Sequence, residues 1–170
     1  MSKFNRNQID FRIESLKLTL DGLSQSLKKL RSKHEESDCS DGIWLLEISE
    51  PIIGSAFISL QNYINSSIYD RFETLDKQYE KYKLGNYLNN TKRTDIELII
   101  GLANYFKHRD DHGNLFRTTT KILSDVNLKF DKEIDITSSP IIRGFDLISK
   151  NWDLMILIKI VKQWRIKLWC

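Results

Sequence analysis

Proline and glycine are scarce in this chain, whose 170 residues include only 2 Pro and 7 Gly. Both residues interrupt helices, so their scarcity favours long helices over many short strands joined by tight turns. Cysteine is also rare. Cys39 and Cys170 stand far apart, without the spacing of a zinc or redox motif, and two thiols do not make a disulfide framework. We therefore expect a reducing, cytoplasmic setting.

The sequence also has little that suggests a membrane. Its polar start, Met-Ser-Lys-Phe-Asn-Arg, leads into an amphipathic pattern, so no signal peptide is expected. The most apolar run, residues 154–161, is too short to span a bilayer and contains Lys159. The net charge of +3 permits a nucleic-acid partner without indicating one. We expect one soluble domain spanning residues 1–170, with no membrane association.

The clearest structural pattern is a heptad seam near the N-terminus. Its apolar residues alternate at intervals of four and three: Ile9, Ile13, Leu16, Leu20, Leu23, Leu27 and Leu30. Polar and charged residues fill most positions between them. This spacing predicts a helix whose apolar face packs inside a helical bundle or against a partner helix.

Three further long helical segments are predicted from apolar periodicity and start signals. The first runs from Ser49-Glu-Pro51 to about Lys83, after a short separate helix over 42–48. The second begins at Thr94, where Glu97 completes a capping box, and stops at 113–114. The last covers about 141–169, and residues 118–130 form a weaker helix or an extended segment.

Polar loops are expected near 34–42, 85–93 and 131–140. Together these segments predict an all-α fold, an antiparallel bundle of four to five helices, two or three of them long.

The richest chemistry lies at the end of the helix that begins at Thr94. If this helix continues through residue 112, a row of polar side chains falls along one side of it, because residues three and four apart are neighbours. The row contains Asn104, His108, Asp111 and His112, with the cations Lys107 and Arg109 beside it. An amide, two imidazoles, a carboxylate and two cations can support acid–base work, phosphate binding or metal ligation.

A metal site agrees poorly with this segment. His108 and His112 have the spacing of a helical two-histidine site, but Arg109 stands where the zincin motif places Glu. Lys107 and Arg109 would also repel a divalent cation. We therefore expect neither a metal nor another cofactor. Metal-independent RNA cleavage fits better, because attack by the ribose 2′-hydroxyl needs a base, an acid and a cation beside the phosphorane.

The layout of long helices with a polar histidine motif at the end of a late helix resembles the HEPN domains. These are all-α proteins of toxin–antitoxin, phage-defence and RNA-processing systems, whose active members carry Arg, a polar residue, a short spacer and His. Two registers of this sequence approach that motif. In one, Ala103 takes the Arg position, Asn104 is the polar residue and His108 is catalytic. In the other, Lys107 replaces the Arg, His108 is the polar residue and His112 is catalytic.

The resemblance implies a metal-independent endoribonuclease that acts as a homodimer on RNA, with an antitoxin or other protein as a further partner. The implied catalytic residues are His108, His112 and Asn104, and the implied phosphate ligands are Lys107 and Arg109. Neither register has the family's Arg, and Lys loses its bidentate geometry. The alternative is therefore a non-catalytic helical module that binds RNA, a nucleotide or a protein partner.

A purely structural interpretation also fits the segment. Lys107, His108 and Arg109 are favoured at a helix C-terminus by the helix dipole alone, and residues 110–112 would then form a solvated turn.

Overall fold

The computed structural model describes residues 9–36, 42–111, 115–130 and 135–170. Within these ranges seven α-helices and one 3₁₀ turn pack together, and no strand is present, which confirms the predicted all-α bundle. The elements are α1 (Ile13–Glu36), α2 (Gly42–Phe72), α3 (Gln78–Tyr82), α4 (Asp95–His108), α5 (Arg117–Asp125), η2 (Ile136–Ser138), α6 (Pro140–Ile148) and α7 (Met155–Trp169).

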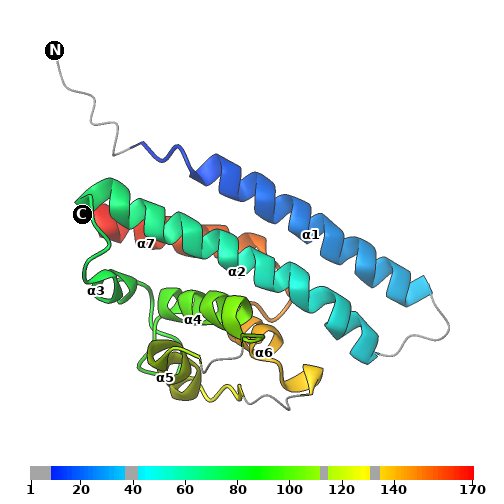
Figure 1. Cartoon of the computed structure of the whole chain (residues 1–170). Helices are drawn as coiled ribbons and strands as arrows, with labels where there is room; N and C mark the ends of the chain where they lie inside the picture. The colour runs from blue at the N-terminus through cyan, green and yellow to red at the C-terminus, as the bar shows by residue number, and fades with distance from the viewer. Residues whose placement is uncertain (1–8, 37–41, 112–114, 131–134) are drawn as a thin grey trace.

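The long helix α2 occupies the centre of the bundle. It packs against α1, α4, α6 and α7, and α1 and α4 both run antiparallel to it (Figure 1). Its fully buried apolar side chains are Ile53, Ala56, Phe57, Leu60, Ile64 and Ile68. A helix with apolar residues around much of its circumference is stable only when neighbours surround it. The other helices therefore arrange themselves around α2.

The heptad seam of α1 is used inside the molecule. Leu16, Leu20 and Leu27 are buried, and Ile13 and Leu23 pack against the same core. Of the two arrangements that the sequence allows, the seam thus packs within the bundle.

The helix α2 begins earlier and ends earlier than the sequence predicts. It starts at Gly42 and continues through Pro51, so the predicted separate helix over 42–48 is wrong. Pro51 lacks an N–H for the carbonyl of Glu47, but both residues are exposed and water can replace this donor. The helix ends at Phe72 because Glu73 adopts a left-handed φ of 57°. Part of the predicted continuation becomes the separate helix α3.

The predicted helix over 141–169 is two helices, α6 and α7. Ser149 is extended and Trp152 has a left-handed φ of 55°. Two hydrogen bonds hold this break. The Trp152 indole donates to Asp146 Oδ1 at 2.8 Å, and the backbone N–H of Asp153 donates to Ser149 Oγ at 2.9 Å. A residue pattern of period 3.6 does not detect such a turn, because apolar side chains recur on both sides of it.

Loop boundaries also differ. α1 continues to Glu36, so residues 34–36 are helical instead of belonging to the predicted loop. Residues 118–125 of the weaker segment 118–130 are helical, as part of α5, whereas residues 126–130 are not. The helix predicted to continue to 113–114 ends earlier, at His108, with Arg109 as its C-cap and residues 109–111 in a turn, so the row of polar side chains does not continue along one helix. Residues 113–114 and the loop positions 37–41 and 131–134 lie outside the described residues.

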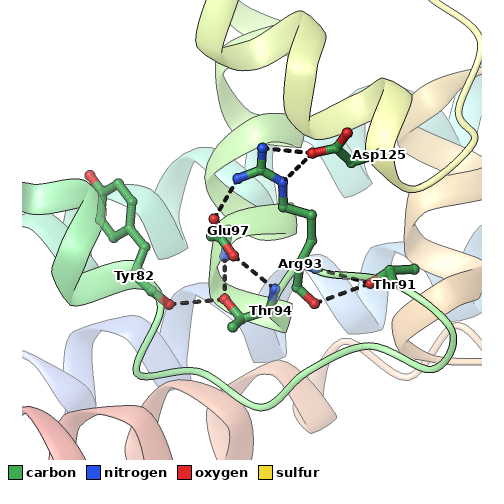
Figure 2. Close-up of polar contacts among 6 residues, drawn as sticks. All are labelled: Tyr82, Thr91, Arg93, Thr94, Glu97 and Asp125. Atoms are coloured by element: carbon green, nitrogen blue, oxygen red, sulfur yellow. Dashed lines mark hydrogen bonds and ion pairs between the residues drawn. The ribbon is translucent and has the colours of Figure 1, made fainter.

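The predicted capping box at the start of α4 is confirmed (Figure 2). Glu97 N donates to Thr94 Oγ1 at 3.1 Å, and Thr94 N donates to Glu97 Oε2 at 3.0 Å. The other Glu97 oxygen binds Arg93 at 2.6 Å, and Arg93 also binds Asp125 of α5 at 2.7 Å. Burial alone would lower the pKa of Arg93, but both carboxylates outweigh burial and raise it. This network joins the start of α4 to α5.

By length and composition, α2 is the one described helix that is apolar enough to cross a bilayer. The core helix of a soluble protein passes the same test. Because α2 packs against four other helices, its apolar side chains serve the bundle core. This packing agrees with a soluble protein.

Leu20 and Leu18 form a matched pair for testing the position of α1, because Leu20 is fully buried and Leu18 is 69% exposed. Leu20→Ala should lower the free energy of unfolding by about 2–5 kcal/mol, as cavity-creating core substitutions do. Leu18→Ala should change it by no more than about 0.5 kcal/mol. Urea denaturation followed by circular dichroism measures both, and equal effects would contradict the described seam.

Candidate functional site at the C-terminal end of α4

A close contact with α2 positions the last turn of α4. A Cβ atom built on Gly54 of α2 would lie 2.5 Å from the Phe106 ring of α4. Any larger residue at 54 would therefore push the two helices apart. Phe106 packs against the core from this side. The polar residues that follow Phe106 thus start from a fixed point beside α2.

Arg109 turns towards α2 and forms a largely buried ion pair. Its Nη1 lies 2.6 Å from Glu50 Oε2, and the Glu50 side chain is only 9% exposed. The other carboxylate oxygen of Glu50 accepts a hydrogen bond from Ser139, the N-cap of α6. The Arg109 guanidinium also lies over the Phe106 ring, 4.8 Å from its centroid. Burial of the Arg109 guanidinium lowers its pKa, but the hydrogen bond and the charge of Glu50 outweigh this effect. The pKa of Arg109 is therefore raised above its ordinary value.

His108 is half-buried and contacts the chain that follows α4. Its Nδ1 lies 2.8 Å from Asp111 Oδ2, and its ring packs edge-on against Phe116 with centroids 5.4 Å apart. A carboxylate only accepts, so Nδ1 carries the proton in this pair. Nε2 is then the ring atom that can exchange a proton with a ligand. In the described part of the chain, no three potential metal-binding side chains come together.

Asn104 points into the bundle. Gln61 of α2 donates to Asn104 Oδ1 at 2.8 Å, which leaves the Asn104 Nδ2 group as a donor. Gln61 is 5% exposed, and its Oε1 has no hydrogen-bond partner among the described residues. Lys107 is exposed on the solvent side, and His112 lies outside the described residues.

The structure thus divides the predicted cluster into two groups. His108 and Asp111 are in contact at the surface with Lys107 exposed nearby in sequence, whereas Asn104 and Arg109 bind partners on α2. Sequence reasoning missed these partners. The charge of Glu50 within an apolar helical segment could have indicated a buried ion pair. Ser49-Glu-Pro51 also fits a helix start, however, where a carboxylate needs no such partner. For Gln61 there was no usable signal, because periodicity does not reveal which turn of one helix meets another.

A groove of about 710 Å³ between α1 and α2 was also not predicted. Hydroxyl groups line much of it, and its charged lining residues, Arg12 and Asp70, form an ion pair at 3.0 Å. α1 and α4 cover different sides of α2 in Figure 1, so this groove is separate from the His108 cluster.

Glu50 and Asp110 allow a matched test of the ion pair, because both contact Arg109 but Asp110 is 91% exposed at 3.6 Å. Glu50→Ala leaves the Arg109 charge and the Ser139 hydroxyl without their acceptor. It should lower the free energy of unfolding by about 2–3 kcal/mol. Asp110→Ala should change it by at most about 0.5 kcal/mol. Thermal and urea denaturation check both values, and a neutral Glu50→Ala variant would show that the pair does not hold α4.

Comparison with known proteins adds no relative. No protein-family model, curated protein or solved structure matches this chain.

Proposed function

We propose that this chain is a HEPN-like endoribonuclease that cleaves RNA without a metal ion, with His108 as its proton-transfer residue. The observation that carries the proposal is the contact between His108 Nδ1 and Asp111 Oδ2 at 2.8 Å on a side chain that is 35% exposed. A carboxylate that holds one imidazole nitrogen orients the other towards a substrate and stabilises the charged ring. The exposed ring is accessible to a large substrate such as RNA.

In this mechanism His108 Nε2 takes the proton of a ribose 2′-hydroxyl. The 2′-oxygen attacks the adjacent phosphorus, and the bond to the 5′-oxygen breaks as that oxygen gains a proton. Lys107, exposed one residue before His108, would stabilise the charge on the phosphorane. The proton for the leaving oxygen would come from a second acid, either His108 of a second copy or His112. A homodimer that combines two clusters satisfies this requirement.

Arg109 and Asn104 take different roles in this proposal from those the resemblance implies. The Arg109 guanidinium is engaged by Glu50 at 2.6 Å, so Lys107 is the better phosphate ligand. Asn104 accepts from Gln61 and holds the helix against α2. Both would act as positioning residues for His108.

The second candidate is a non-catalytic helical module that binds RNA, a nucleotide or a protein such as an antitoxin. The internal partners of Arg109 and Asn104 favour it, because they leave fewer polar groups for catalysis. An endoribonuclease and a non-catalytic binding module would each be compatible with a toxin or phage-defence system.

Cleavage of tRNA and mRNA by the purified protein tests the proposal. His108→Ala should reduce the rate by about 100- to 10,000-fold, the usual contribution of general acid–base catalysis. Asp111→Ala should cause a smaller loss. Asp110→Ala is the matched control, because this neighbouring carboxylate does not contact His108 in the structure and should leave the rate unchanged. Activity should survive EDTA.

His112→Ala, measured alongside, identifies the register. A loss equal to that of His108→Ala would indicate that both histidines transfer protons. Cleavage that requires a divalent ion, or that persists in His108→Ala, would contradict the mechanism. No cleavage by a folded wild-type protein would favour the binding module.

A further inference from the structure

A stack of alternating cations and aromatic rings lies where α2, α3 and α7 end. Arg165 and Arg71 lie over the Trp169 ring, 4.9 and 5.7 Å from its centroid. Arg71 and Lys81 lie over the Phe72 ring, at 5.3 and 4.7 Å. We call these five side chains the cation–aromatic stack. None of them belongs to the cluster around His108.

Helix packing explains why the stack is at this place. The C-terminal ends of α2 and α7 lie side by side, near α3 (Figure 1). The Trp164 indole donates to the Lys81 carbonyl at 2.9 Å and joins α7 to α3. Unpaired carbonyls at helix C-termini attract cations, which accounts for part of the positive charge.

Helix dipoles do not account for two buried donors in the stack. Arg71 Nη1 and Trp169 Nε1 are inaccessible to solvent and have no hydrogen-bond partner among the described residues. Nearly all buried N–H groups in folded proteins have an acceptor, so an acceptor that reaches these two donors would stabilise the stack. One of these donors belongs to a cation, so an anion would satisfy them best.

The stack also has cations and an aromatic surface to offer a ligand. Arg165 is partly neutralised by Asp10 at 3.5 Å, whereas Arg71 and Lys81 form no ion pair within the described ranges. The Phe72 side chain is 38% exposed. Cations that track phosphates beside rings that stack on bases are the features of single-stranded nucleic-acid binding.

We propose that the cation–aromatic stack is a contact surface for single-stranded RNA. Arg71 and Lys81 bind a backbone phosphate. The flexible Lys81 ammonium moves from the Phe72 ring to the phosphate, and a base stacks on the ring in its place. The inference rests on the proposed function only for its choice of RNA. The C-terminal ends of α2 and α7 lie at the end of the bundle where α4 starts (Figure 1), whereas His108 ends α4. The 14 residues of α4, roughly 21 Å at 1.5 Å each, therefore separate the two sites.

Binding of a fluorescein-labelled 12-nucleotide 2′-O-methyl oligouridylate, followed by fluorescence polarisation, tests this surface. The methyl group removes the attacking hydroxyl, so binding is measured without cleavage. Phe72→Ala should weaken binding at least about five-fold, which is the lower range for loss of one stacked base. Lys81→Gln should weaken it and lower the slope of log K against log salt by about 0.7, the value for one phosphate contact.

Trp44→Ala and Lys121→Gln are the matched controls, one exposed aromatic ring and one exposed lysine on other parts of the bundle. Both should bind like the wild type. Circular dichroism melting verifies that each variant is folded.

The inference is overturned if the wild type does not bind the oligonucleotide, or if both stack variants bind normally. It is also overturned if those variants instead shift the sedimentation mass, because the stack would then be a protein interface. Normal oligonucleotide binding without cleavage of natural RNA would reject the role of His108 and retain the stack. Cleavage that depends on His108, together with normal binding by the stack variants, would reject the stack and retain the role of His108.

Discussion

Burial of α2 on most of its sides is the constraint on which the rest of the structure depends. This helix of 31 residues carries apolar side chains around much of its circumference, and those between Ile53 and Ile68 are buried against other elements. α1 covers one side with its heptad seam, and α4, α6 and α7 cover others. Close approach is possible where side chains are small, as at Gly54 beneath Phe106. The path of α4, and with it the position of His108, follows from this packing.

The ion pair between Glu50 and Arg109 is a consequence of the same arrangement. A carboxylate on the central helix needs a partner, because burying an unpaired charge is costly. The end of α4 supplies the cation, and Ser139 adds a hydrogen bond from the start of α6. The inward half of the polar cluster is therefore structural. Its outward half, with Lys107, His108 and Asp111, is what remains for chemistry.

Most of the sequence predictions that the structure confirms depend on patterns within a single helix. The capping box of Thr94 and Glu97 depends on residues three apart, and the seam of α1 depends on a repeat within one helix. The helix breaks at Glu73 and Trp152 were missed because their left-handed backbones occur at residues that do not favour them. Pro51 lies inside α2 and does not mark its start, because water can replace the hydrogen bond that proline cannot donate at this exposed position.

The candidate site could be predicted only in part. Residues 104–111 share one helix end, so their proximity followed from the sequence. Which of them face α2 did not, because the register between α2 and α4 is set by packing. The contact of Gln61 with Asn104 joins residues 43 positions apart, and no periodic pattern connects them. The cation–aromatic stack combines three helices and was equally hidden, although the basic and aromatic residues of α7 were visible.

The chemical ends of the cleaved RNA test the central claim most directly, because they record which oxygen attacked the phosphorus. Mass spectrometry of the products from a defined oligonucleotide should find a 2′,3′-cyclic phosphate on one fragment and a 5′-hydroxyl on the other. That pair of ends requires the 2′-hydroxyl as nucleophile and therefore a base such as His108. Fragments with 3′-hydroxyl and 5′-phosphate ends would show attack by water and would contradict the account.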